Sequence, residues 1–312
     1  MNTKTKTPFR RPVVAAVSTE SHKLQKVLAQ IGLGSRRDME VWIEEERVLV
    51  NGQIATKGTR VTSSDRIKVD GRDVHVSATA VTPRVLLYHK PEGEIVTRDD
   101  PQGRETVFSN LPGLRGARWL SVGRLDVSTS GLLIFTTSGE LANSMMHPRF
   151  KVEREYAARV FGTLNQTQAD QLCQGIELPD GMAAFNALTD EGGEGSNHWY
   201  RVQVSEGRNR LVRRLFEALG FTVSRLIRVR FGYLQLPSRL KRGQFMELEP
   251  AEVIELLAWL KQPLIETEDD IQRAKPAKRP SRVSTKTQSS PPLVKGQKNA
   301  MRGQARSTRD RA

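Results

Sequence analysis

The chain of 312 residues contains little cysteine, few aromatic residues and no long apolar run. Its single cysteine, Cys173, excludes an internal disulfide and indicates a reducing compartment, so we expect a cytoplasmic protein. No segment approaches the roughly 20 consecutive apolar residues of a membrane-spanning helix, and we expect no membrane partner. The five histidines and the cysteine do not show the spacing of metal ligands, so no metal is expected.

Several common catalytic motifs are also missing. The sequence has no GxSxG turn, no phosphate-binding GxxxxGK[ST] loop and no HExxH pair. These absences exclude the most frequent serine hydrolases, nucleotide hydrolases and zinc proteases.

The net charge of +14 lies in the two ends of the chain. Residues 1–20 carry +3 and residues 273–312 carry +11, so residues 21–272 are neutral overall. We interpret residues 1–20 as a disordered basic arm rather than a transit peptide, and residues 263–312 as a disordered basic tail. Such polycationic tails attract phosphate without regard to sequence, or they serve only solubility. Within the neutral body, residues 205–245 carry +8 and form the better candidate for a binding face, whereas residues 246–272 carry −7.

Residues 21–78 have the pattern of a small separate module. Apolar residues at helical spacing from Leu24 end at the Gly32–Gly34 turn, and Ser35 and Asp38 form a capping box that opens a second helix. The segments VLVNGQ and RIKVDGRDV then predict tight hairpins. This stretch resembles an S4 RNA-binding domain. The resemblance implies RNA contacts for Arg36 and Arg37 in the first turn of the second helix, although two solvated surface arginines would look the same.

A linker at residues 76–83 leads to a larger domain at 84–262. Its predicted strands outnumber its predicted helices, which favours an α+β fold with a mixed, mainly antiparallel sheet. The expected strands include RVLLYHK, RWLSVGRLD, GLLIFTT, REYAARVFG, HWYRVQVSEG and VSRLIRVRFGYLQL. We expect helices at 139–146, opened by a Thr137–Glu140 capping box, at 166–174, at 209–219 and at 251–261.

The segment GRLDVSTSGLL places one carboxylate, Asp126, between apolar residues and directly before a Ser-Thr-Ser-Gly turn. Burying an unpaired carboxylate costs several kcal/mol, so the residue needs a reason to be there. Two interpretations are open. Asp126 could fix the turn by accepting backbone N–H bonds, with the hydroxyls of residues 128–130 capping nearby N–H groups. Alternatively, arginines could keep it ionised as a nucleophile or base.

Three further stretches favour chemistry. REYAARV places Tyr156 on a strand, on the face of Arg154; EGRNRLVRRLFEALG predicts an arginine-rich helix; and LYHKPEGEIVT places Lys90 at a strand end. Together with GRLDVSTSGLL, these segments resemble the motifs of the ribosomal RNA pseudouridine synthases that carry an N-terminal S4 domain. Finer matches, such as GGEGSNHWY and LRGARWLSVGRLD, resemble the branch that acts on the large subunit. Many relatives have His-Gln where this chain has Arg210-Leu211, so no role of that pair is carried over.

The resemblance implies a cofactor-free isomerase that detaches uracil from ribose, rotates it and reattaches it through C5. Asp126 matches the catalytic aspartate, which acts at C1′ or removes a proton from C2′. Tyr156 matches the tyrosine that stacks on the target base, and Arg213 the cation paired with the aspartate. Arg124 matches an arginine expected to contact RNA beside the flipped nucleotide. Phosphate contacts are weaker expectations for other basic residues: Lys90, Arg208, Arg214, Arg228 and Arg230.

The expected partner is large-subunit ribosomal RNA or a pre-ribosomal particle, bound by a monomer. Two other classes of protein remain open. A non-catalytic S4-type RNA-binding or assembly factor would not need the set of Asp126, Tyr156 and Arg213. A hydrolase acting on ribonucleosides would need a second acid or a metal site, and the sequence shows neither. A family member with a different ribosomal uridine as its target is a third alternative.

Overall fold

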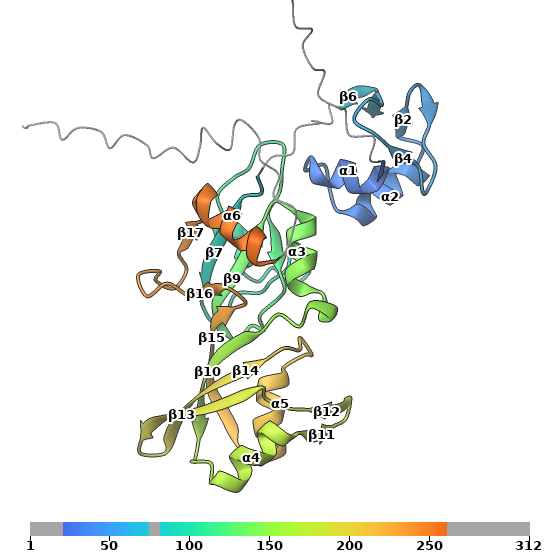
Figure 1. Ribbon diagram of the computed structural model, residues 1–312. Helices are drawn as coiled ribbons and strands as arrows, with labels where there is room; N and C mark the ends of the chain where they lie inside the picture. Colours follow the sequence, from blue (N-terminus) through green and yellow to red (C-terminus); the bar gives the residue numbers. More distant parts are fainter. Residues whose placement is uncertain (1–20, 75–81, 261–312) are drawn as a thin grey trace, which may run out of the picture. The chain divides into compact units, whose positions relative to one another are not determined.

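The computed structural model describes residues 21–74 and 82–260 (Figure 1). The expectations for the basic arm at 1–20, for the linker up to residue 81 and for the tail from residue 261 lie outside the described residues. Within the described part of the chain, no helix has the length and apolarity needed to cross a membrane.

The first described part contains two helices and a small antiparallel sheet. Helices α1 (Leu24–Gln30) and α2 (Arg36–Glu44) precede strands β2 (Val48–Val50), β3 (Gln53–Ile54), β5 (Ile67–Val69) and β6 (Arg72–Val74), which pair in the order β3-β2-β5-β6. The short strands β1 (His22–Lys23) and β4 (Arg60–Val61) pair with each other.

The local signals of this part are confirmed. The Ser35 hydroxyl accepts from the Asp38 N–H at 3.0 Å, and the Asp38 carboxylate accepts from the Ser35 N–H at 2.6 Å. Asn51 and Gly52 have φ values of 54° and 84°, as a type I′ hairpin turn requires. The buried side chains of Leu24, Leu28 and their neighbours form a core between the helices and the sheet.

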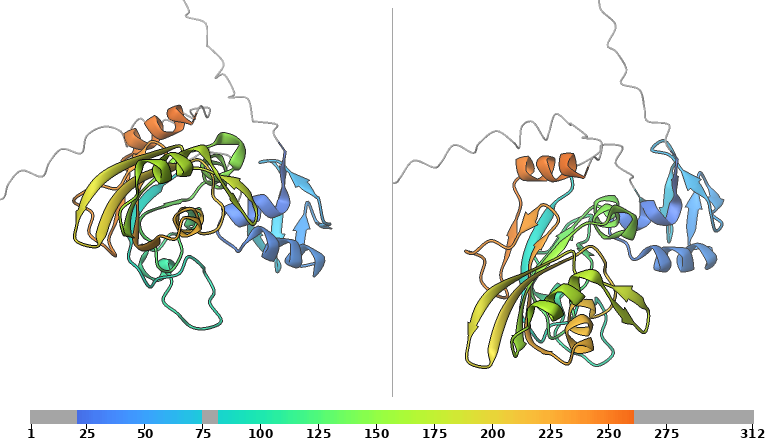
Figure 2. Two further views of the ribbon diagram at one scale, coloured as in Figure 1. Left: turned by 90° about the horizontal axis from the view of Figure 1, so that it is seen from below. Right: turned by 60° about the horizontal axis from the view of Figure 1, so that its bottom comes forward.

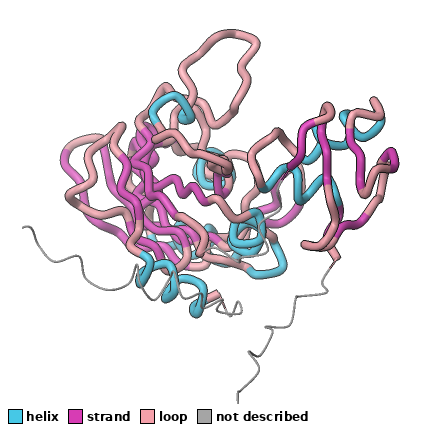
Figure 3. Tube along the Cα trace, turned by 90° about the horizontal axis from the view of Figure 1, so that it is seen from above, coloured by secondary structure: helices cyan, strands magenta, loops and turns pink. Residues whose placement is uncertain are grey.

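The second described part is built on a nine-stranded mixed sheet. Seven strands pair in the order β13-β14-β10-β15-β9-β7-β17, β8 pairs with β9, and β16 with β15. Their bounds are β7 (Val85–Lys90), β8 (Leu120–Val122), β9 (Ser130–Thr136), β10 (Arg154–Phe161), β13 (Ala187–Glu194), β14 (Asn197–Val204), β15 (Thr222–Phe231), β16 (Leu234–Gln235) and β17 (Phe245–Glu247). Among the strand pairs of this sheet in the described residues, only β9–β15 is parallel, so the expected α+β fold with a mainly antiparallel sheet is confirmed. Figure 3 shows these strands side by side.

Two hydrophobic cores flank the central β9–β15 pair. Helices α3 (Gly139–Met146) and α6 (Pro250–Trp259) contribute to one core with β7 and β9. Helices α4 (Gln166–Gln174) and α5 (Leu211–Ala218) contribute to the other, with β10, β14, β15 and the hairpin of β11 (Ile176–Leu178) and β12 (Gly181–Ala183). The long loop between β7 and β8, teal in Figure 2, contains a short 3-10 helix, η1 (Val107–Asn110). A second 3-10 helix, η2 (Pro148–Phe150), follows α3.

Three local expectations are wrong. The predicted strand at 118–126 forms a ladder only at β8, because Gly123 has a φ of 80° and turns the chain away from the sheet. Helix α3 is capped by Ser138, whose hydroxyl accepts from Leu141 N–H at 3.2 Å, whereas the Thr137 hydroxyl accepts from Arg84 N–H. Helix α5 begins two residues later than expected, because Arg210 at its start has a φ of 49°.

Candidate active site

Asp126 lies in the turn between β8 and β9, outside any strand. The turn is closed by a hydrogen bond from the Thr129 N–H to the Asp126 carbonyl oxygen, at 3.0 Å. The expected capping by hydroxyl groups is not observed within the described residues. The Thr129 and Ser130 hydroxyls are buried without a hydrogen-bond partner there.

The turn is instead held by its own carbonyl groups. The carbonyl oxygens of residues 127, 128 and 129 accept, in order, from Gly93 N–H at 2.8 Å, from Arg213 Nη2 at 2.9 Å and from Lys90 Nζ at 3.0 Å. These donors come from the loop after β7, from α5 and from the end of β7. Three separate segments therefore fix the position of the turn that carries Asp126.

The Asp126 carboxylate is not used in this network. The side chain is half-buried, and within residues 21–74 and 82–260 no hydrogen bond or ion pair engages its carboxylate. Two cations lie within electrostatic range. Burial lowers the pKa of Lys90 to about 8, against the attraction of Glu94 and Asp126. Burial also lowers the pKa of Arg213, against the attraction of Asp126. Both cations thus attract a carboxylate that makes no hydrogen bond within the described residues.

The close approach of β9 and β15 explains why the residue after Ser130 is a glycine. Gly131 has a φ of +105°, and a Cβ at this position would lie 2.3 Å from the Arg228 carbonyl oxygen and 2.6 Å from the Arg228 nitrogen. These close approaches occur where β9 pairs in parallel with β15, at Ser130 with Ile227 and Gly131 with Arg228. The sequence thus brings the turn directly against β15.

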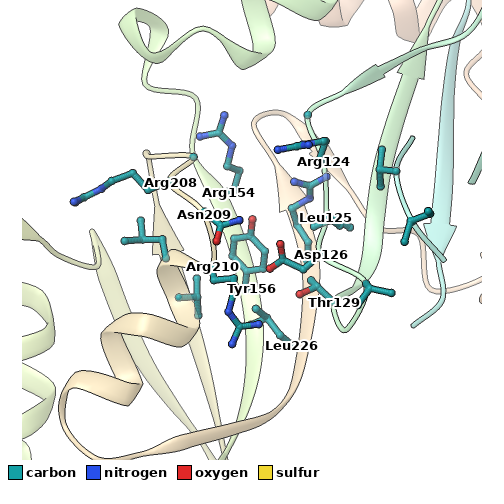
Figure 4. A pocket seen from close by; sticks show the side chains of 18 of the residues that line it. Arg124, Leu125, Asp126, Thr129, Arg154, Tyr156, Arg208, Asn209, Arg210 and Leu226 are labelled. Atoms are coloured by element: carbon teal, nitrogen blue, oxygen red, sulfur yellow. The ribbon is translucent and has the colours of Figure 1, made fainter. Parts of the chain in front are cut away.

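The Asp126 side chain faces a cavity of about 720 Å³ (Figure 4). The cavity is lined by the Asp126 turn, the β7–β8 loop, the segment before α5, and strands β10 and β15. Tyr156 of β10 is half-buried, packs against both the second core and a smaller cluster beside β7, and turns its ring toward Asp126. Two residues expected to act together, Asp126 and Tyr156, are therefore brought to one cavity.

Arg213 lies near Asp126 without touching its carboxylate. Its guanidinium donates to the Ser128 carbonyl oxygen at 2.9 Å and to the Val223 carbonyl oxygen at 2.6 Å, and its Nε is buried without a partner in the described chain. The side chain therefore positions the turn through the backbone and attracts the carboxylate at longer range.

The other basic residues fall into different surroundings. Arg124 is exposed at the cavity, and Arg36 and Arg37 are exposed in the first turn of α2. Arg208 lines the cavity and also binds the β11–β12 hairpin through the Gly181 and Met182 carbonyl oxygens.

Three of the expected phosphate-binding residues are held elsewhere. Arg214 pairs with Asp180, and Arg230 pairs with Glu155 at 3.2 Å; neither lines the cavity. For Lys90, the solvated-edge alternative is wrong, whereas the phosphate contact stays a prediction. Its side chain is 0% exposed, and its ammonium group donates to the carbonyl oxygens of Pro91 and Thr129. Within the basic segment 205–245, Arg214 and Arg230 are therefore paired with acidic side chains.

The structure also adds cavity residues that sequence reasoning did not propose: Arg154, Asn209, Arg210, Leu226 and Phe231. The alternation of β10 already placed Arg154 on the face of Tyr156, which was a usable signal. Nothing local in the sequence distinguishes Asn209 or Phe231. Within the described residues, no three His, Cys, Asp or Glu side chains gather in a way that could hold a metal ion.

Comparisons with known proteins identify the family of the chain. Residues 84–218 match the RNA pseudouridylate synthase family, and residues 23–67 match the S4 domain. A crystal structure of a pseudouridylate synthase has the same fold, with a TM-score of 0.52 at 23% identity over 75% of this chain and 99% of that one. The chain belongs to the RNA pseudouridylate synthases with an S4 domain, as its motifs predicted.

Three curated relatives carry the same name. The ribosomal large subunit pseudouridine synthase B of Salmonella typhimurium (strain LT2) is 57% identical over 235 residues, which cover 74% of this chain and 81% of that protein. The Escherichia coli (strain K12) protein of the same name has the same identity and coverage. That of Pseudomonas aeruginosa is 54% identical over 233 residues, or 74% of this chain and 60% of the relative.

Proposed function

We propose that this protein converts one uridine of large-subunit ribosomal RNA to pseudouridine, with Asp126 as the catalytic carboxylate. The observation that carries the proposal is the free Asp126 carboxylate in a cavity, on a turn that neighbouring segments hold by its carbonyl groups. An aspartate that only forms a turn would accept hydrogen bonds from backbone N–H groups with its carboxylate. The large-subunit target is inferred from the relatives' name at 54–57% identity.

The reaction is an isomerisation without net loss of atoms. The bond between C1′ and N1 breaks, the base rotates, a new bond joins C1′ to C5, and the proton from C5 is replaced by one at N1. Glycoside hydrolysis usually needs two acids, one to protonate the leaving oxygen and one to activate water. Here the uracil leaves as a stabilised anion and no water takes part, so a single carboxylate acting at the ribose suffices.

The neighbouring residues have separate roles in this proposal. Tyr156 stacks on the uracil base, since its ring faces Asp126 across the cavity. Arg213 is a positioning residue, because it fixes the turn through the Ser128 carbonyl oxygen and attracts the Asp126 carboxylate at longer range. Arg124, exposed at the cavity, contacts the RNA beside the flipped nucleotide.

The S4 domain, at residues 21–78, supplies binding to structured RNA. Arg36 and Arg37 are exposed at the start of α2, where side chains and free N–H groups attract phosphate. Arg208 adds charge at the cavity. We propose that a single copy of the chain, without a cofactor, carries out binding and turnover in the cytoplasm.

The test uses ribosomal RNA from cells that lack the gene. Carbodiimide labelling followed by reverse transcription produces a stop at each pseudouridine. We expect one large-subunit stop to disappear and to return with the wild-type gene but not with Asp126→Asn. If every stop persists, a non-catalytic S4-type RNA-binding factor, or a different RNA target, is the better account.

A further inference from the structure

Two buried arginines share one aromatic ring in the cavity. Arg154 is 8% exposed and Arg228 is 2% exposed. Their guanidinium carbons lie 4.8 Å and 5.0 Å from the centre of the Phe231 ring. All three residues line the cavity that contains Asp126, and Figure 4 shows Arg154 beside Tyr156.

Neither guanidinium group has a carboxylate partner within the described residues. Arg154 Nη1 donates to the Ser205 carbonyl oxygen at 3.1 Å, and Arg228 Nε donates to the Leu132 carbonyl oxygen at 2.7 Å. Arg228 Nη2 is buried and has no hydrogen-bond partner in the described chain. The nearest acid on β10, Glu155, pairs with Arg230 and Arg201 instead.

This arrangement is unfavourable in the free protein. Burial lowers the pKa of Arg154; Tyr156 opposes this shift, and the positive charge of Arg228 adds to it. Buried charges are normally paired, because an unpaired charge in the interior costs several kcal/mol. Two guanidinium groups that lack a carboxylate and face the same cavity therefore form a receptor for an anion that arrives with the ligand.

The strand register places this receptor beside the site of chemistry. Arg228 pairs across the sheet with Tyr156, and Phe231 pairs with Arg154 two residues earlier on β10. Arg228 also lies opposite Gly131, directly after the Asp126 turn. The two arginines are therefore direct neighbours of Tyr156 and of the Asp126 turn in the same cavity.

We propose that Arg154 and Arg228 bind one phosphodiester group next to the target uridine. This inference rests on the proposed function, since it takes the ligand to be a uridine in RNA. A phosphodiester carries its negative charge before, during and after the reaction, whereas uracil is charged only after the glycosidic bond breaks. Guanidinium groups match phosphate in charge and in hydrogen-bond geometry. The receptor thus acts mainly on RNA affinity.

The binding experiment compares Arg154→Gln and Arg228→Gln with Arg225→Gln, all in an Asp126→Asn background that prevents turnover. Arg225 is the matched control, because it is exposed on β15 and does not line the cavity. Heptauridylate is the first probe, since it does not assume which ribosomal RNA is the substrate. Kd is measured at several salt concentrations for each protein.

We expect each cavity variant to raise Kd about tenfold, as the loss of a charge-assisted hydrogen bond would. The slope of log Kd against log salt should fall by about 0.7 for one lost contact with single-stranded RNA. Arg225→Gln should stay within about twofold of the parent. Equal effects of the cavity variants and the control would contradict the receptor.

A second arm uses protein that retains both arginines, so that a folding defect cannot explain the result. The RNA is a fragment around the mapped uridine, with a neutral methylphosphonate replacing one flanking phosphate. We expect one flanking position to weaken binding about tenfold, and Arg154→Gln to be insensitive to the same replacement. If neither flanking position matters, the arginines do not bind a phosphodiester next to the target uridine and the proposal fails. If every stop persists in the cellular mapping, the target RNA is in question, whereas the heptauridylate measurements still test the receptor.

Discussion

Gly131→Ala should damage the enzyme far more than an ordinary glycine substitution. An added Cβ would lie 2.3 Å from the Arg228 carbonyl oxygen, whereas real Cβ contacts closer than 3.0 Å essentially never occur. The clash is with backbone, so β9 and β15 must separate beside the Asp126 turn. Overpacking of this kind costs about 1–3 kcal/mol, and the positive φ adds about 1–2 kcal/mol.

The matched control is Gly181→Ala. Gly181 has a φ of +102°, close to the +105° of Gly131, but nothing lies within 4 Å of its added Cβ. The control therefore carries the backbone strain without the clash. We expect Gly131→Ala to lower the free energy of unfolding by about 2–5 kcal/mol, and Gly181→Ala by about 1–2 kcal/mol.

Two assays separate these effects. Urea unfolding gives the free energy, and single-turnover pseudouridine formation gives the rate. Gly131→Ala should lose at least 100-fold in rate, because a shift of about 1 Å at a reacting group has an effect of this size. Gly181→Ala should keep nearly the full rate. Equal losses in both variants would refute the argument that contact between β9 and β15 positions Asp126.

Three further predictions follow from the surroundings of the turn and from the tail. The pKa of Lys90 is about 8 in the folded protein and 10.5 for an ordinary lysine, so the unfolded chain binds more protons between these pH values and stability rises with pH. Relative to Lys90→Met, the free energy of unfolding should increase by about 2 kcal/mol from pH 7.5 to 9.5, and parallel pH profiles would contradict this. Arg213→Lys should reduce kcat at least tenfold with little change in Kd, because one ammonium group cannot span two carbonyl oxygens as the guanidinium does. The control is Arg214→Lys, since Arg214 pairs with Asp180, and equal kcat values for the two variants would contradict the role of Arg213. Deletion of residues 273–312, which carry +11, should flatten the salt dependence of RNA binding, and an unchanged slope would mean that the tail makes no phosphate contacts.

The features that the sequence predicted well have local causes. The bounds of α3 and α4 were predicted at 139–146 and 166–174, and the Ser35 capping box and the Asn51-Gly52 turn are confirmed. Capping and tight turns involve only a few neighbouring residues, so their chemistry can be read from short segments. The choice of Ser138 over Thr137 depended on Arg84, 53 residues away along the chain, and was therefore missed.

The arrangement of the basic residues could not be predicted in the same way. Lys90 and Arg228 are both nearly completely buried, although each sequence position is compatible with a solvated strand. Their burial depends on β9 lying between β7 and β15, which is a long-range pairing. The motif resemblance identified Asp126 and Tyr156 as site residues and they share a cavity, but it could not show that the Asp126 turn is held through its carbonyl groups.

The most direct test of the account compares purified wild type and Asp126→Asn on a large-subunit RNA transcript. RNA binding is measured at equilibrium, and pseudouridine is measured with enzyme in excess over RNA. Because the Asp126 carboxylate makes no hydrogen bond within the described residues, its replacement by the similarly shaped amide should leave the turn and the fold intact. We predict a Kd within about threefold of wild type and no detectable pseudouridine. Turnover by Asp126→Asn, or a parallel loss of binding and turnover, would contradict the catalytic role of this carboxylate.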